Sequence, residues 1–258
     1  MADTPLRVER AGGTVWCTLE RPPLNLLEPV LIRAIHETFA ALAHDESVRA
    51  AVVTGAGRAF TAGMDVHVLR GLDVEGARTL ITALHAAIQA VHHAPFPVIA
   101  AVNGPSLGAG LELALACDLR VAAAGATFGL PEVRVGVPSV IEAALLPALV
   151  GPGRAAEVLL TGEAIDAERA LEWGLVNRVV DGARLTASVD ALLGKILSAG
   201  PAAIRLQKAL MLRWRYTDLE GAIRSGVEAF AAAYTTGEPQ EGAAAFLEKR
   251  APRFGGGA

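Results

Sequence analysis

The chain has 258 residues, of which 52% are hydrophobic and 19% are charged, and its formal net charge is -4. This length is enough to bury a substantial core, so we expect a globular protein of one large domain or two small ones. The negative net charge and the absence of a run of basic residues argue against a nucleic acid or an anionic membrane as a partner.

The N-terminal residues contain no continuous apolar segment of the kind found in secretory signals. No stretch of the chain approaches the ~18 consecutive apolar residues that a membrane span needs. We therefore expect a cytoplasmic protein. The two cysteines, Cys17 and Cys117, lie in apolar runs, which favours buried thiols in a reducing compartment over a disulfide.

Strand and helix patterns alternate through the first half of the chain. Strands are predicted at residues 6–9, 14–19, 51–54, 98–102 and 119–122, and helices at 28–43, at 74–92 and from about 108. Such alternation predicts an α/β fold with crossover connections. From residue 138 the pattern is nearly all helical apart from a strand at 175–180, so the last sixty residues are expected to be helical.

Residues 103–112 read NGPSLGAGLE and join an apolar strand to an apolar helix. Small residues allow a ligand to approach the backbone, and free N–H groups at a helix start can hold a developing negative oxygen. The N–H of Ala109 is the candidate donor. A dinucleotide-binding turn has the same order of elements, but Leu113 stands where its third glycine would fall. A purely structural helix start is the other alternative.

Two glutamates are candidates for acid and base catalysis. Glu112 lies in the apolar helix, where an unpaired carboxylate is costly to bury and tends toward its neutral form. Glu132 follows a proline that sets the chain direction at the start of a turn-rich segment. If both face one cleft, one could activate water while the other delivers a proton. Structural or exposed roles remain open for both.

Residues 57–65, GRAFTAGMD, follow the strand at 51–54 and precede a helical stretch. Asp65 is a candidate N-cap for that helix. The N–H of Met64 could supply a second donor to the same cleft. The alternative is an ordinary turn between a strand and a helix.

Three motifs in this order resemble the enoyl-CoA hydratase/isomerase (crotonase) family. They are GxGRAFxAGxD at 55–65, NGxxxGxGxELxxxCD at 103–118 and FGxPExxxG at 128–136, and the ending EGxxAFxEKR at 241–250 is also similar. The resemblance spans residues 6–254. It implies a crotonase-like spiral of ββα units over residues 1–198 and a helical C-terminal trimerisation region over residues 199–258.

The resemblance also implies a role for each candidate in the reaction. Met64 and Ala109 match the two backbone donors of an oxyanion hole that polarises the thioester carbonyl of a coenzyme A (CoA) ester. Glu112 and Glu132 match both catalytic glutamates of the hydratases, of which the first would activate the water that adds at Cβ and the second would protonate Cα.

Further positions match the family's substrate contacts. The CoA-binding positions are Ala62 beside the adenine, Asp65 and His67 in the same segment, and Lys249 near the phosphates, supplied either by the same chain or by a neighbouring subunit. Ser139, Phe230 and Phe246 match positions that line or close the acyl pocket.

Three residues depart from the family pattern. Ala109 stands where glycine is common, so a methyl group faces the pocket. Ser139 lies in PSVIE, where typical hydratases have a glycine-rich turn, so the acyl group or even the reaction can differ. His67 replaces a frequent CoA-binding lysine, which weakens one phosphate contact.

The expected activity is hydration of short or medium 2-enoyl-CoA thioesters by a homotrimer or a dimer of trimers, with CoA as part of the substrate and no separate cofactor. Alternatives on the same oxyanion hole are an enoyl-CoA isomerase, a hydrolase or another enolate reaction. A non-catalytic acyl-CoA-binding scaffold belongs to a different class. A metalloenzyme is disfavoured, because the six histidines show no ligand spacing beyond His92 and His93, a pair more typical of a helix C-terminus.

Overall fold

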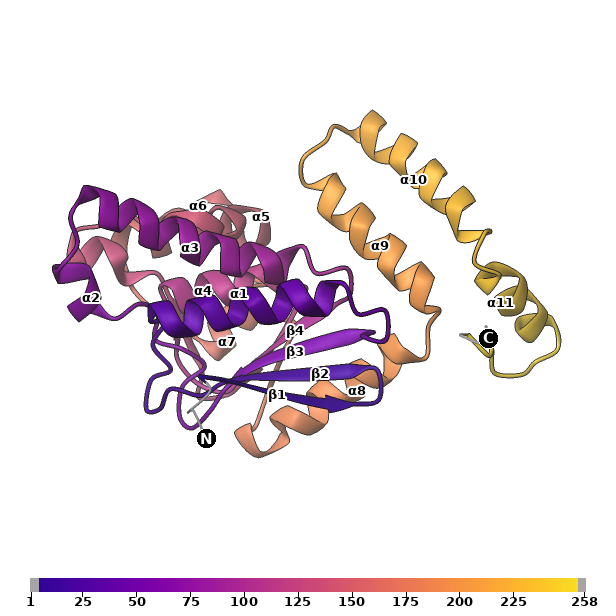
Figure 1. Ribbon diagram of the computed structural model, residues 1–258, viewed down its shortest axis with the longest axis horizontal. Coiled ribbons are helices and arrows are strands. Elements are labelled where there is room, and N and C mark those ends of the chain that lie inside the picture. Colours follow the sequence, from indigo (N-terminus) through magenta and orange to yellow (C-terminus); the bar gives the residue numbers. More distant parts are fainter. Residues whose placement is uncertain (1–4, 255–258) are drawn as a thin grey trace.

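The computed structural model describes residues 5–254, which form a central sheet, the helices that cover it and a separate helical arm (Figure 1). The central sheet has six strands in the order β1-β2-β3-β4-β6-β9. Their bounds are β1 Leu6–Ala11, β2 Thr14–Leu19, β3 Ala50–Gly55, β4 Val98–Val102, β6 Leu119–Ala123 and β9 Arg178–Val180. β1 is antiparallel to β2, and every later neighbour is parallel. The predicted α/β class is therefore confirmed.

The two faces of this sheet are covered by different helices. α1 (Pro29–Ala43) and α3 (Val74–His92) lie over one face, and α8 (Leu185–Leu197) lies against the other (Figure 1). Alternate residues of β3 pack on opposite faces of the sheet. Ala51 and Val53 belong to the larger core, while Ala50 and Val52 pack in the cluster that includes α8. This alternation follows from the two-residue period of a strand. α1 and α3 each bury one apolar stripe with helical spacing.

A second, three-stranded sheet pairs β5 (Ser106–Leu107) with β7 (Thr127–Gly129) and β7 with β8 (Ile165–Asp166). These strands are too short to show a two-residue period, and none was predicted. They fix the segment that begins α4 (Ala109–Ala116) beside the segment that precedes the short helix η1 (Pro131–Val135).

The connections after the sheet strands are mostly short helices. They are α2 Val66–Arg70, η2 Ile141–Leu145, α5 Leu146–Val150, α6 Pro152–Thr161, α7 Ala167–Glu172 and η3 Gly182–Arg184. The predicted helix at 74–92 and the predicted strands at 14–19 and 98–102 match α3, β2 and β4 at both ends. Cys17 and Cys117 are buried free thiols, and burial raises the pKa of each to about 12.

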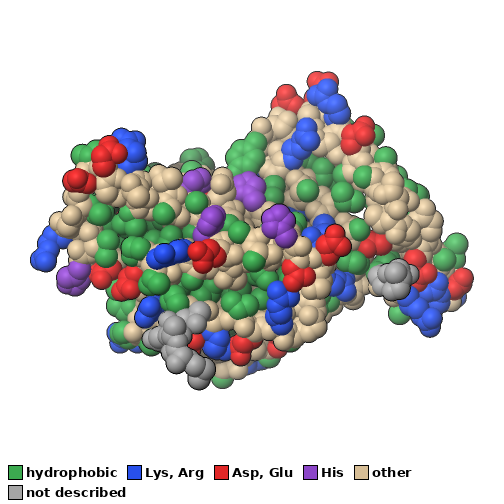
Figure 2. Space-filling model, in the orientation of Figure 1, with side chains coloured by type: hydrophobic (Ala, Val, Ile, Leu, Met, Phe, Trp, Pro, Cys, Tyr) green, Lys and Arg blue, Asp and Glu red, His purple; other side chains and the backbone are tan. Residues whose placement is uncertain are grey.

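The C-terminal helices α9 (Pro201–Trp214), α10 (Leu219–Ala233) and α11 (Glu238–Leu247) form an arm that extends away from the sheet (Figure 1). Their helical structure agrees with the sequence pattern, while the expected boundary between residues 198 and 199 stays a prediction. The arm exposes large apolar side chains, and Figure 2 shows hydrophobic groups at its surface. They include Trp214, Leu219, Ile223, Val227, Phe230, Tyr234, Phe246 and Leu247.

Among the described residues no single helix has the length and apolar character of a membrane span. One pair of helices, Gly182–Leu197 and Pro201–Trp214, passes that test together by length and composition, although it is bent by 105° at its break.

Candidate active site

The loops that follow β3 and β4 meet at one edge of the sheet, because parallel neighbours end on the same side. Hydrogen bonds join these loops directly. The N–H of Thr61 donates to the Pro105 carbonyl at 3.1 Å, and the N–H of Leu107 donates to the Thr61 carbonyl at 3.0 Å. The Asn103 side chain donates from Nδ2 to the Gly57 carbonyl at 3.0 Å. The two glycine-containing motifs therefore form one rigid unit.

Asn25 supports the loop after β3 from within the protein. Its side chain is fully buried, and Nδ2 contacts the carbonyl oxygens of Ala56, Ala59 and Phe60 at 2.9, 2.9 and 3.2 Å. A buried amide with these partners fixes the backbone that leads to Met64. This role could not be predicted from the sequence, because a lone asparagine after Pro-Leu is an ordinary turn residue.

Close backbone contact brings the two predicted N–H donors into one region. Gly63 has a φ of +85°, and a Cβ there would lie 2.6 Å from the Leu107 carbonyl oxygen and 3.3 Å from the Ala109 nitrogen. Only glycine fits this position. Neither the Met64 N–H nor the Ala109 N–H donates to another group within residues 5–254, and both residues line the same cavity. Two free backbone donors at one cavity are what an oxyanion hole needs, and this role of the pair stays a prediction.

Glu112 lies in the first turn of α4, a helix in which all eight residues are buried. Its side chain is only 3% exposed, and Oε1 accepts a hydrogen bond from the Ala143 N–H at 3.1 Å. The pKa of Glu112 is raised to about 8, chiefly by burial and also by the nearby carboxylates of Glu132 and Glu142, while the hydrogen bond from the Ala143 N–H opposes the shift. A carboxyl group with this pKa exchanges protons near neutral pH.

Glu132 is the second residue of η1, which Pro131 begins. Its Oε2 accepts a hydrogen bond from the Ser139 hydroxyl at 2.7 Å. Its Oε1 lies against the start of α4, since a Cβ added to Gly108 would be 2.9 Å from that atom. The absence of a side chain at Gly108 thus makes room for the Glu132 carboxylate beside the Ala109 donor.

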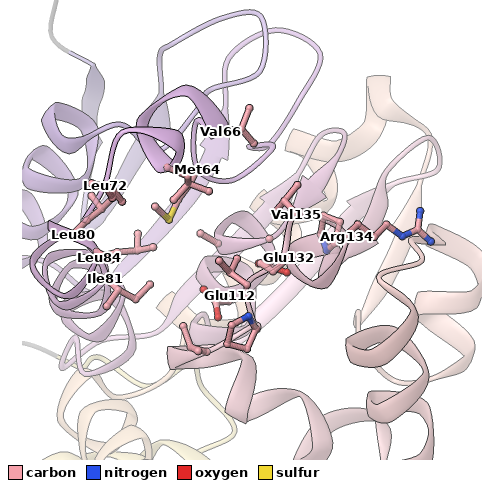
Figure 3. A pocket seen from close by; sticks show the side chains of 18 of the residues that line it. Met64, Val66, Leu72, Leu80, Ile81, Leu84, Glu112, Glu132, Arg134 and Val135 are labelled. Carbon is pink, nitrogen blue, oxygen red and sulfur yellow. The ribbon is translucent and has the colours of Figure 1, made fainter. Parts of the chain in front are cut away.

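Glu112 and Glu132 come from different elements and face one cavity of about 430 Å³ (Figure 3). Most of the lining is aliphatic and comes from α2, α3 and the segment around η1, as expected of a pocket for an apolar group with few polar contacts. The aliphatic lining includes Met64, Val66, Leu69, Leu72, Leu80, Ile81, Leu84, Val135, Val137 and Val140. The cavity residues of α2 and α3 were not predicted from the sequence. Apolar residues at helical spacing look the same whether they line a cavity or pack in the core.

A third carboxylate lies behind the cavity. Glu142 of η2 is 7% exposed, and its Oε1 is 2.8 Å from Nδ1 of His85 on α3. Its Oε2 is buried without a hydrogen-bond partner among the described residues. Burial raises the pKa of Glu142, and His85 opposes that shift. The sequence carried a signal for Glu142, an acidic residue in the apolar run VIEAALL, but we assigned it no role.

The predicted CoA-binding segment forms the start of α2. Asp65 caps this helix, as expected, by accepting the His67 N–H at 2.8 Å, and it also contacts His67 Nδ1 at 2.9 Å. These bonds lower the pKa of Asp65. Ala62 lines the cavity, and the His67 side chain is exposed. The roles of Ala62, Asp65 and His67 in CoA binding stay predictions.

Four other predicted site residues do not line the cavity. Ser139 instead contacts Glu132, while its neighbours Pro138 and Val140 are part of the lining. Phe230 and Phe246 are exposed on the helical arm, and exposed Lys249 follows α11. The single chain therefore does not bring these three residues to the site. Their predicted roles require a neighbouring subunit.

No group of three or more His, Cys, Asp or Glu side chains within residues 5–254 is arranged to hold a metal ion. His92 is the last residue of α3 and its Nδ1 contacts the Ala116 carbonyl at 3.0 Å, while His93 is the C-cap. The histidine pair is thus a feature of the helix end, as its position indicated.

Comparisons of the sequence with a family model and with known proteins agree with one another. The family model described as enoyl-CoA hydratase/isomerase matches residues 9–257. Crotonyl-CoA hydratase of Syntrophomonas wolfei is 38% identical over 239 residues, with 92% of each chain covered. Short-chain-enoyl-CoA hydratase of Clostridium acetobutylicum is 33% identical over 246 residues, with 94% of each covered.

The same similarity holds in three dimensions. The crystal structure of enoyl-CoA hydratase from Bacillus anthracis has a TM-score of 0.94 at 34% identity and covers 98% of this chain and 100% of that one. The enoyl-CoA hydratase structure from Mycobacterium smegmatis also has a TM-score of 0.94, at 37% identity, and covers 97% of this chain and 98% of that one.

Proposed function

Because the chain belongs to the enoyl-CoA hydratase/isomerase family, we propose that it uses Glu112 and Glu132 to add water across the 2,3 double bond of a 2-enoyl-CoA thioester. The product is a 3-hydroxyacyl-CoA. The protein is an enzyme of the crotonase superfamily with the crotonase fold. The observation that supports this reaction is the pair of carboxylates that face one aliphatic cavity beside two unpaired backbone N–H groups.

The thioester carbonyl binds between the Met64 and Ala109 N–H groups. Negative charge develops on that oxygen when water attacks Cβ, and two fixed donors stabilise it without rearrangement of the site. Loss of one such donor typically costs ~2.7–4 kcal/mol of transition-state stabilisation. The hydrogen bonds between the loops after β3 and β4 keep the two donors in place.

The two glutamates divide the two proton transfers of the reaction. Ionised Glu112 takes a proton from water as the hydroxyl group adds to Cβ, and protonated Glu132 gives its proton to Cα. Proton transfer from Glu112 back to Glu132 then restores the starting state, so no net proton is consumed.

The cavity favours an uncharged hydrocarbon or aryl acyl group. Apart from the two glutamates and two arginines, most of its lining is aliphatic. The side chains of the two arginines, Arg78 and Arg134, are exposed to solvent. Two relatives are named for crotonyl-CoA and short-chain substrates. We propose short or medium acyl chains, with the methyl group of Ala109 and the Ser139 turn limiting the space around the reacting carbons.

The test is the loss of enoyl-thioester absorbance with crotonyl-CoA and longer, branched and aryl analogues. Glu112→Gln and Glu132→Gln should each lower kcat by on the order of 10²–10⁴. Glu37→Gln, at an exposed position of α1, is the matched control. Mass measurement of a 3-hydroxyacyl-CoA product completes the test. Full turnover in Glu112→Gln with none in Glu132→Gln would instead indicate one-carboxylate isomerase chemistry.

We further propose a homotrimer or a dimer of trimers assembled through the helical arm. The apolar side chains exposed on α10 and α11 support this arrangement, because large exposed apolar patches mark interaction surfaces. Assembly would also give Phe230, Phe246 and Lys249 a route to a neighbour's cavity. A cytoplasmic location and the lack of a separate cofactor remain predictions.

A further inference from the structure

We propose that Glu142, anchored by His85, is a positioning residue that holds Glu112 in place and sets the charge beside it. This inference rests on the proposed hydratase function and adds a third carboxylate to that site. Glu142 does not line the cavity, so it acts on Glu112 and not on the substrate.

The geometry connects three elements through short contacts. His85 of α3 holds Glu142 at 2.8 Å, and the next residue along η2, Ala143, donates its N–H to Glu112 of α4 at 3.1 Å. The position of the Ala143 N–H therefore depends on where the Glu142 side chain is fixed. A shift of η2 relative to α3 would therefore move this backbone donor away from Glu112 Oε1.

The backbone of η2 requires such an anchor. Ile141, directly before Glu142, has a φ of +32°, in a region that β-branched residues rarely adopt. A conformation of this kind costs about 1–3 kcal/mol and persists only where surrounding contacts hold it. The His85–Glu142 hydrogen bond is the side-chain contact that joins this segment to α3.

Charge gives the second part of the effect. The ionisable groups that act on Glu142 from α3 are His85 and His93, and those that act on Glu112 are Glu132 and Glu142. His85 is partly exposed, with 42% of its side chain accessible, and its Nδ1 contacts the buried Glu142 carboxylate. Glu142 thus presents Glu112 with a like charge that opposes the ionisation of Glu112.

The first experiment removes this charge and keeps the hydrogen bond. The amide oxygen of Glu142→Gln still accepts from His85, but the like charge near Glu112 is gone. Ionised Glu112 is the active form, and loss of a like charge favours ionisation. The acid limb of the pH profile of kcat/KM should therefore move to lower pH. At a pH below the wild-type midpoint, Glu142→Gln should retain a several-fold higher fraction of its plateau kcat/KM than wild type does. An unchanged limb or a move to higher pH overturns the proposal; Glu37→Gln is the control.

The second experiment separates positioning from general loss of structure. His85→Ala frees Glu142 and should lower kcat on the order of tenfold with little change in KM, because Glu112 is displaced but the cavity is kept. His85→Asn retains a donor near the position of Nδ1 and should restore most of the rate. Equal loss in both variants, or no loss in either, contradicts the anchoring role. His36→Asn, at an exposed site on α1, is the matched control.

A measurement without turnover keeps this inference separate from the proposed function. Carbon NMR of labelled glutamate, with the Glu112 carboxyl assigned by comparison with Glu112→Gln, follows its titration in wild type and in Glu142→Gln. A lower midpoint in the variant supports the inference even if no enoyl-CoA is hydrated. An identical midpoint overturns it even if hydration is observed.

Discussion

At the scale of single residues, the site depends on carboxylates placed where water is scarce. Glu112 could be singled out from the sequence because it interrupts an apolar helix, and Glu142 interrupts an apolar run in the same way. The contact between Ser139 and Glu132 could not be predicted, because their seven-residue separation brings them together only when η1 turns the chain. The burial of Glu112 and Glu142 could be predicted from their apolar neighbours in the sequence. Their hydrogen-bond partners could not, because these come from other elements of the fold.

Glu112→Gln should stabilise the protein at alkaline pH while it abolishes turnover. The folded-state pKa of Glu112 is about 8, above its unfolded value, so the stabilising effect of neutral Glu112 is present at low pH and is lost as pH rises toward 8. An amide does not ionise, and it can still accept from Ala143. Urea unfolding should show a gain of about 1–3 kcal/mol near pH 8 and almost none near pH 4. An equal difference at both pH values would contradict this account.

Ser139→Ala should lower kcat by roughly tenfold, because Glu132 loses the hydrogen bond that positions its carboxyl group, and such a bond is typically worth about 1 kcal/mol. Ser139→Thr keeps the hydroxyl and should retain more activity. Steady-state kinetics of both variants provide the measurement, with Ser198→Ala as the control, because Ser198 is the C-cap of α8 and its hydroxyl donates to the Lys195 carbonyl. Wild-type kcat in Ser139→Ala would show that the contact has no role in turnover.

At the scale of elements, the long members were predictable and the short ones were not. α3 and β4 carry enough residues for their periods to show, whereas β5, β7, β8 and η2 have two to five residues each and no period. The site lies among these short elements. The motifs identified the loops that meet, but the hydrogen bonds between those loops depend on β3 and β4 being neighbours in the sheet.

Gly63→Ala should impair the oxyanion hole through the backbone. The new Cβ would lie 2.6 Å from the Leu107 carbonyl, so the loop that carries Met64 must move, and we expect kcat/KM to fall on the order of 10²-fold. Gly57→Ala is the matched control, since Gly57 also has a positive φ but a Cβ there meets nothing within 4 Å. It should cost about 1 kcal/mol of stability and leave turnover intact. Similar kinetics for both variants would disprove the steric argument.

At the scale of the whole molecule, a compact body contains the cavity and an arm contains the largest exposed apolar side chains (Figure 1). The helical content of the arm was predictable from its period. Its projection away from the sheet was not, because amphipathic helices look alike whether they pack on their own core or on another subunit.

Val227→Asp tests the arm as an assembly surface. Val227 is 61% exposed on α10, so a charge there should leave the fold of one chain intact but disrupt a trimer contact. Light scattering should show the mass of a smaller species. Val74→Asp, at a 74% exposed position of α3, should leave the mass unchanged. A wild-type mass for Val227→Asp would place the interface elsewhere.

The backbone origin of the two proposed oxyanion donors has an evolutionary consequence. Every residue except proline supplies the same N–H group, so the side chains at positions 64 and 109 are free to drift while the charge-stabilising chemistry is retained. Met64 and Ala109 both line the cavity, and their replacement by larger or smaller residues would resize it in one mutational step. Acyl preference can therefore diverge among descendants of this chain faster than the reaction itself.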